Sequence, residues 1–284
     1  MARRTIAGFL AAVALALASD AAAAPSTNIN DYVLFAVSTL KTKGPIVANG
    51  DIGVNISGGR LIAPRFLTAP NSVVASDRVR FDRNPMNTVY QQLYANIIEH
   101  YGPPNPTPFT PPIIADVKAA CGYPIPFPSC APGSPIDVAI GTTTNLGPGT
   151  YGKVRVHGTA LSSGTLVLTG GNYVFCDLKV GRNADLQVAA PSTINVVGNV
   201  AFGVNSFLGP EANSGLVASD IQVYAGGPVV KLTRSSYSNA RICAPDTKMR
   251  LTQGGTHVGV YVANYIRTEV VNLDVGSPSG AFLP

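Results

Sequence analysis

The feature that most constrains this chain is a rhythm of very short apolar alternations between Val154 and Leu273. Each is three residues long, with an apolar first and last residue, and Gly, Asn, Asp or Ser follows soon after. Period-two alternation over so few residues predicts β-strands and is too short for helices. The alternations are Val154-Arg-Val156, Leu166-Val-Leu168, Tyr173-Val-Phe175, Leu178-Lys-Val180, Leu186-Gln-Val188, Ile194-Asn-Val196, Val200-Ala-Phe202, Ile221-Gln-Val223, Val230-Lys-Leu232, Met249-Arg-Leu251, Val258-Gly-Val260 and Val271-Asn-Leu273.

Strands this short and this numerous predict a β-solenoid, in which each strand pairs with its counterpart one coil away. We expect an all-β fold, an irregular right-handed parallel β-helix. The composition agrees, because 29 Gly and 23 Pro supply turns and only 12% of the residues are charged. With about 20 residues per coil, main coils over 136–275 would number about six to seven. Stacked at about 4.8 Å, they would form a rod of about 30 Å.

The first half of the chain is predicted to begin this solenoid and then leave it. Tyr32–Val37 reads as an opening strand, and 46–82 has the rhythm of one to two early coils. At 84–101, Asn84 can cap a helix and Pro85 suits its first position. The apolar residues that follow recur at helical spacing, so they predict one long α-helix packed alongside the coils. The segment 102–135 contains eleven prolines and is expected to be an ordered excursion. The coils and the two intervening segments would form a single domain over 24–284.

The N-terminus has the pattern of a secretory signal peptide over residues 1–23. Arg3 and Arg4 precede an apolar run from Ile6 to Ala18, and cleavage is expected after Ala23. The run is too short to span a membrane, so we expect a secreted protein, extracellular or periplasmic, without a membrane span. The cations are scattered along the chain, so the sequence gives no sign of a nucleic-acid partner.

Four cysteines in an exported chain predict disulfides. Cys121 and Cys130 flank a Pro-rich loop, and a bond between them is favoured because it would close a short loop. Cys176 and Cys243 would then remain for each other. Spacing alone leaves all three possible pairings open.

The order of these features resembles the secreted β-helix proteins of the ice-binding-like fold and related bacterial surface proteins. The resemblance is carried by the opening strand, Gly50-Asp-Ile-Gly-Val54, the predicted helix and Leu146-Gly-Pro-Gly-Thr-Tyr151. It implies an irregular β-helix with a long helix beside it, and ice as one candidate ligand. The sequence departs from ice-binding members, because the strand middles carry Lys, Arg and Gln instead of a sustained Thr ladder.

Candidate catalytic and ligand-binding residues are few. Asp177 and Asp185 are the acids best spaced to act together in glycoside hydrolysis, although turn and strand-end roles fit them better. None of His100, His157 and His257 lies at ligand spacing from Cys or another His, so no metal site or other cofactor is predicted. Tyr224, Tyr237, Tyr261 and Tyr265 are candidates for a sugar-binding strip, against ordinary solenoid packing.

The sequence therefore favours an exported, non-catalytic structural or surface-interaction protein, with envelope glycans or other surface proteins as candidate partners. Ice binding is the first alternative. A polysaccharide-degrading β-helix enzyme is the second, and it requires acids that converge beside Arg or Lys.

Overall fold

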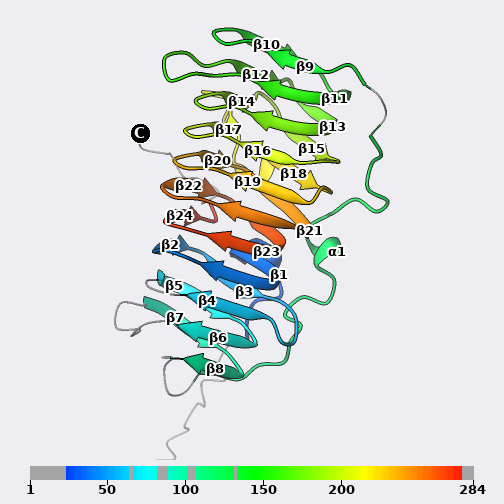
Figure 1. Cartoon of the computed structure of the whole chain (residues 1–284). Coiled ribbons are helices and arrows are strands. Elements are labelled where there is room, and N and C mark those ends of the chain that lie inside the picture. The colour runs from blue at the N-terminus through cyan, green and yellow to red at the C-terminus, as the bar shows by residue number, and fades with distance from the viewer. Residues whose placement is uncertain (1–23, 64–66, 82–88, 101–105, 131–132, 277–284) are drawn as a thin grey trace, which may run out of the picture.

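The computed structural model describes residues 24–63, 67–81, 89–100, 106–130 and 133–276. The signal-peptide prediction lies outside these residues. In the described part, short parallel strands stack into a single rod from β9 and β10 at one end to β8 at the other (Figure 1). The predicted parallel β-helix is confirmed.

The strands form three faces around an apolar interior, and long strands turn a corner and contribute to two faces. We name the faces for the side chains described below: basic, covered and neutral. The basic face contains β9 (Ile136–Val138), the second halves of β11 (Gly149–Val156) and β13 (Gly171–Val180), β16 (Val200–Phe202), β19 (Val229–Leu232), the second halves of β21 (Arg241–Leu251), β23 (Tyr261–Thr268) and β1 (Tyr32–Thr42), β4 (Arg60–Ala63), β6 (Arg78–Phe81) and β8 (Ile97–His100).

The other two faces follow the same stacking. The covered face contains the first halves of β11, β13, β21, β23 and β1, together with β15 (Ser192–Val196), β18 (Ile221–Ala225), β3 (Asp51–Val54) and the second parts of β5 (Leu67–Ala75) and β7 (Val89–Tyr94). The neutral face contains β10 (Thr143–Leu146), β12 (Thr165–Leu168), β14 (Asp185–Val188), β17 (Phe207–Pro210), β20 (Tyr237–Asn239), β22 (Gly255–Val258), β24 (Val271–Asp274), β2 (Ile46–Asn49) and the first parts of β5 and β7.

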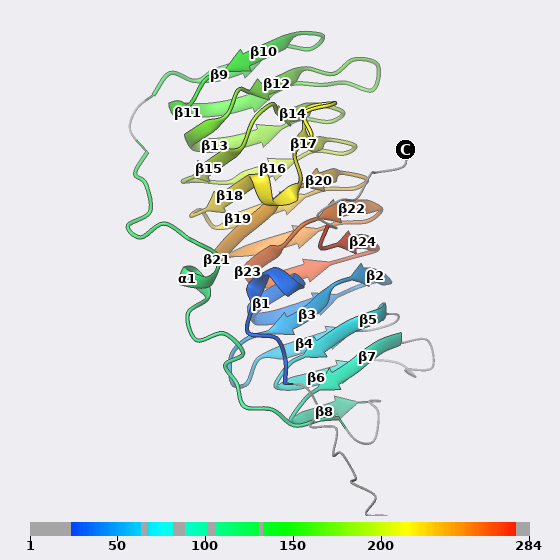
Figure 2. The same ribbon diagram turned by 180° about the vertical axis from the view of Figure 1, so that it is seen from behind.

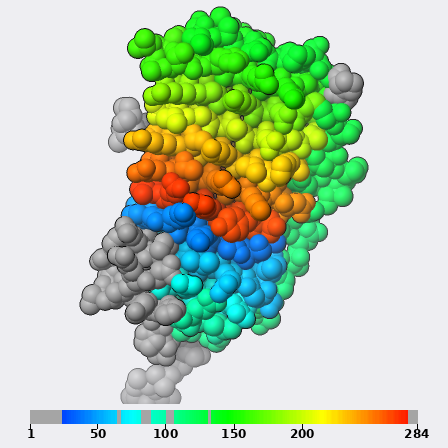
Figure 3. All heavy atoms as spheres, viewed as in Figure 1, coloured from blue at the N-terminus to red at the C-terminus, as the bar shows by residue number. Residues whose placement is uncertain are grey.

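The order of coils along the rod differs from their order along the chain. Strand β1 lies between β23 and β3, so the first coil of the chain stacks on its last complete coil. Figure 3 shows the blue N-terminal coils directly against the red C-terminal ones. Apolar side chains continue across this junction, because Ile266 pairs with Leu40 and both are fully buried. The two halves therefore share one core.

The early part of the solenoid is longer than the sequence predicted. Beyond the expected one to two coils, β1, β4, β6 and β8 each contribute a strand to the basic face. The corners between strands repeat as well. Asn183 and Asn205 adopt left-handed φ angles of 50° and 53°, and the side chain of Asn205 donates to Oδ1 of Asn183 at 2.9 Å. Asn tolerates this backbone conformation, so equivalent turns stack on one another.

The prediction of a long helix over 84–101 is wrong. In its described part, this segment forms β7 and β8, which pair with β5 and β6. Val89 and Ile97, counted in the apolar helical stripe, point outward and are 48% and 43% exposed. The open edge of β5 and β6 offers backbone partners to a segment rich in Val, Tyr and Ile, and this pairing outweighs the local periodicity.

A Pro-rich strap, residues 106–130, runs along the covered face in place of a helix. Its only regular element among the described residues is α1 (Val117–Ala120), and Figure 2 shows it beside β21 and β23. Ile113, Ile114 and Val117 pack on apolar side chains of the covered face. Asn55 of the rod donates to the Ile114 carbonyl at 2.9 Å and accepts from the Ile114 amide at 2.8 Å.

Two disulfides and one ion pair fasten the strap to the rod. Cys121 bonds Cys243 of β21, and Cys130 bonds Cys176 of β13, so the favoured Cys121–Cys130 pairing is wrong. The strap is extended, so its two cysteines reach different coils instead of each other. Lys118 also contacts Asp246 at 2.7 Å. None of the described helices is long and apolar enough to cross a membrane.

Candidate functional site: the basic face

The outward side chains of the basic face form rows that run parallel to the rod. The central row contains Arg155, Lys179, Ala201, Lys231, Arg250, Arg267, Lys41, Ile62 and Arg80, each paired in register with the next. A neighbouring row adds Lys153, Lys248, Arg60 and Arg78. Cations that are scattered in the sequence therefore gather on one face.

The in-out-in strand pattern explains why these side chains are exposed. The residues on either side of each central cation point inward, as Val230 and Leu232 do around Lys231, and both are essentially fully buried. Alternation along a strand then forces Lys231 outward. Parallel pairing with no register shift in this part of the strands places the next cation directly alongside.

The densest part of the central row crosses the junction between the two halves of the chain. Lys231, Arg250, Arg267 and Lys41 occupy four consecutive coils. At a strand spacing of about 4.8 Å, four positions span about 14 Å. Like charges directly opposite on neighbouring strands repel, so this row weakens the stack that carries it.

Acidic residues offset the charge mainly toward the ends of the face. Glu99 contacts Arg60 at 2.7 Å and Arg78 at 3.9 Å, and hydrogen bonding from Arg60 lowers the pKa of its carboxyl. Asp137 contacts His157 at 2.5 Å near the opposite end. Near the centre, Glu269 contacts Arg267 at a longer 3.9 Å. The middle of the row therefore remains strongly positive.

The two candidate acids, for which turn and strand-end roles were favoured, lie on different faces. Asp177 lies on β13 at the start of the basic face, and its Oδ1 accepts a hydrogen bond from the Asn199 amide at 2.9 Å. Asp185 begins β14 on the neutral face, where burial raises the pKa of its carboxyl. Within the described residues, no group of three or more His, Cys, Asp or Glu side chains is placed to hold a metal ion.

The three histidines also lie apart. His100 ends β8, and His157 contacts Asp137 on the surface. His257 is fully buried in the solenoid, where its Nδ1 lies 2.8 Å from the hydroxyl of Ser238. That hydroxyl is also 2.7 Å from the hydroxyl of Tyr261. Burial lowers the pKa of His257 to about 3, so it is neutral at ordinary pH.

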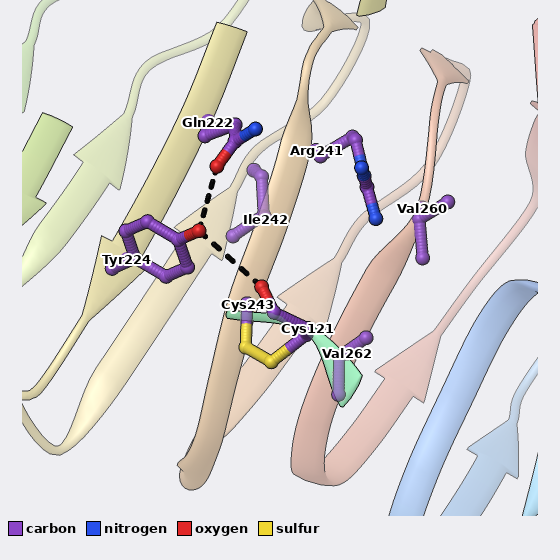
Figure 4. A pocket seen from close by; sticks show the side chains of 8 residues that line it. All are labelled: Cys121, Gln222, Tyr224, Arg241, Ile242, Cys243, Val260 and Val262. Atoms are coloured by element: carbon purple, nitrogen blue, oxygen red, sulfur yellow. Dashed lines mark hydrogen bonds between the residues drawn. A yellow bond between two sulfur atoms is a disulfide. The ribbon is translucent and has the colours of Figure 1, made fainter. Parts of the chain in front are cut away.

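The four tyrosines considered as candidates for a sugar-binding strip occupy four different surroundings. Tyr261 is in the core and Tyr265 is on the basic face. Tyr237 lies on the neutral face, and Tyr224 lies on the covered face. Figure 4 shows the small cavity beside Tyr224, whose hydroxyl donates to Gln222 at 2.6 Å and is 3.3 Å from the Cys121 carbonyl oxygen.

That cavity is too small for a ligand. Its volume is about 10 Å³, and the Cys121–Cys243 disulfide lines it. A single water molecule requires about this much space.

The surface that sequence reasoning missed is the basic face. The sequence shows the Lys and Arg residues at the middle of the strands, but it does not show the register that aligns them on one face.

A comparison with protein-family models finds no match, and a comparison with curated proteins finds none either. Solved structures that match include an ice-binding protein from an Arctic yeast (11% identity, 92% of this chain and 98% of that chain, TM-score 0.39). A second is an ice-binding protein from an Antarctic Flavobacteriaceae bacterium, with 11% identity over 92% of this chain and 100% of that chain and a TM-score of 0.33. A third is the domain of a Shewanella frigidimarina ice-binding protein, with 16% identity over 90% of this chain and 98% of that chain and a TM-score of 0.34. These matches agree with the resemblance to the ice-binding-like fold and assign no role to any residue of this chain.

Proposed function

We propose that this protein is an exported, non-catalytic binding module that holds an anionic polysaccharide along its basic face. The observation that carries the proposal is the unbroken row of Lys231, Arg250, Arg267 and Lys41 across four coils. A chain of negative groups laid along the rod would replace the repulsion within this row by attraction.

The shape of the face supports an extended ligand. The cations lie on successive strands of a continuous sheet, so one polymer chain can contact several of them at once. Contacts made by linked groups reinforce one another without any single strong site. Tyr265 is the aromatic side chain of this face in the described strands, so the interleaved stacking surface typical of single-stranded nucleic-acid binding is missing there.

Export is supported by the cysteines. All four are paired in disulfides, which persist in oxidising compartments outside the cytosol. N-terminal sequencing of the protein recovered outside the cytoplasm tests this part of the proposal. A mature chain that still begins at Met1 would contradict it.

Retention on immobilised heparin and alginate tests the ligand class, with neutral dextran as the control matrix. We expect retention on both polyanions that is lost as salt rises, because exposed charges are screened. Replacing Lys231 and Arg250 by Ala should weaken retention, whereas the matched variant Arg234→Ala, which removes a cation from the turn after β19, should not. Equal retention of all three proteins would refute the assignment to the basic face. Stronger retention on polyuridylate than on either polysaccharide would point to nucleic acid instead.

The absence of catalysis is tested in the same samples. Incubation with each polysaccharide should leave its chain length unchanged by size-exclusion chromatography. Shortening that depends on the folded protein would replace the binding proposal with the enzyme alternative.

Ice binding is the second candidate, and the neutral face favours it. An outward row on this face contains Thr143, Thr165, Asp185, Phe207, Tyr237, Thr256, Asn272, Val47 and Thr68, with Asp185 as its single charge. Mostly uncharged side chains at a regular strand spacing can order water, although Phe207 and Tyr237 interrupt the Thr positions. Thermal hysteresis that is abolished by Thr256→Lys would support this candidate. No hysteresis and no inhibition of ice recrystallisation would end it.

A further inference from the structure

The neutral face contains a hollow of about 510 Å³ between β17, β20 and the loop that follows β17. Figure 2 shows β17 and β20 as neighbours on the rod. Phe207, Tyr237 and Asn239 line the hollow from the strands, and Glu211, Asn213 and Leu216 line it from the loop. Its volume lies within the range of about 300–1,000 Å³ that is typical of small-molecule sites.

The apolar part of the hollow is a pair of stacked rings. Phe207 and Tyr237 occupy successive coils, with ring centroids 5.3 Å apart and planes inclined by 2°. Both side chains are half-buried, so part of each ring meets solvent in the hollow. Gly209 allows the Phe207 ring to lie close to the strand, because a Cβ there would be 2.9 Å from the ring.

The polar part contains a buried acceptor without a partner. Asn239 is 7% exposed, and its Oδ1 makes no hydrogen bond within the described residues. A buried carbonyl oxygen that lacks a donor costs free energy. This oxygen has almost no exposed surface, so a ligand hydroxyl reaches it only when the Asn239 amide rotates toward the hollow that the residue lines. Glu211 supplies a further acceptor at the edge of the hollow.

The charge of the lining defines the kind of ligand. No Lys or Arg is among the described lining residues, and Glu211 is the one acidic residue there. An anionic group would therefore be repelled. The site fits a ligand with several hydroxyl donors, an apolar ring surface and no negative charge.

We propose that this hollow binds a neutral hexose unit of a glycan. The axial and ring C–H groups of a pyranose would contact Phe207 and Tyr237, and its hydroxyls would donate to Glu211 and, after rotation of the Asn239 amide toward the hollow, to Asn239 Oδ1. This site lies on a different face from the cationic row, so it goes beyond the binding of anionic polysaccharide and does not depend on it.

Saturation-transfer NMR with the methyl glycosides of glucose, galactose, mannose and N-acetylglucosamine tests the proposal. We expect at least one of them to bind in the millimolar range. Asn239→Leu and Glu211→Ala should each weaken that binding at least tenfold. The control Tyr265→Ala removes a partly exposed ring from the basic face and should leave binding unchanged.

Thermal unfolding without sugar provides a second measurement. Asn239→Leu should not lower the unfolding temperature, because it removes an unpaired buried acceptor. If Asn239→Leu does not fold, Glu211→Ala in the loop decides the test alone. The proposal is overturned if none of the four glycosides binds, or if the folded variants bind as the original protein does. Heparin retention measured in parallel separates this outcome from a failure of the basic face.

Discussion

Reversing the charge of Arg250 should make the rod more stable while weakening its binding to polyanions. Arg250 lies in register between Lys231 and Arg267, with an exposed side chain. Cross-strand charge pairs contribute roughly 0.2–1 kcal/mol each. Arg250→Glu converts two repulsive pairs into attractive ones, so after screening we expect a gain of about 1 kcal/mol.

For a domain of this size, about 1 kcal/mol corresponds to a rise of about 2–4 °C in the unfolding temperature. Thermal unfolding at low salt measures it. The rise should fade at about 1 M salt, where the Debye length is only about 3 Å. Arg234→Glu is the matched control, because it changes the net charge equally but lies in the turn after β19, off the basic face.

The reasoning is supported if Arg250→Glu raises the unfolding temperature and at the same time weakens retention on heparin. Arg250→Glu should elute from heparin at clearly lower salt than Arg234→Glu. If the unfolding temperature of Arg250→Glu falls at low salt, the row does not repel as the register indicates. If the two variants elute together, the basic face is not where the polyanion binds.

Three further predictions concern stability. Replacing Cys121 and Cys243 by Ser opens a link between residues 122 positions apart and should lower the free energy of unfolding by about 2–5 kcal/mol, measured in denaturant; an unchanged midpoint would contradict this. Asn55→Ala removes both hydrogen bonds to Ile114 and should cost about 1–3 kcal/mol, with faster proteolysis of the strap and not of the coils. The pKa of buried His257 is about 3, below its unfolded value near 6.5, so stability should be full above pH 6.5 and fall by up to about 1.4 kcal/mol per pH unit below it. His257→Gln should remove that part of the acid sensitivity, and equal pH profiles for both proteins would refute it.

The strand rhythm predicted the architecture well, because the alternation within each triplet identifies which of its side chains are buried and which are exposed. Val230, Met249 and Leu251 are core residues, as their triplets indicate. Lys231 and Arg250 are exposed for the same reason. This information is local, so it can be obtained from the sequence without knowing which strands pair with one another.

The errors arose where a distant partner overrode a local preference. The residues from Val89 to Ile98 fit a helical stripe, yet the edge of β5 and β6 pairs with them as strands. Cys121 and Cys130 are close in sequence, yet the extended strap carries them to different coils. Neither the edge nor the path of the strap is encoded in the spacing of nearby residues.

By itself, then, the sequence determined that this protein is a rod of short parallel strands with cations at the middle of several of them. Only the tertiary structure decided that these cations form one row, because register, not sequence distance, sets which side chains are adjacent. Lys41 and Arg267 are 226 positions apart and lie side by side, because the first coil of the chain stacks on its last complete coil.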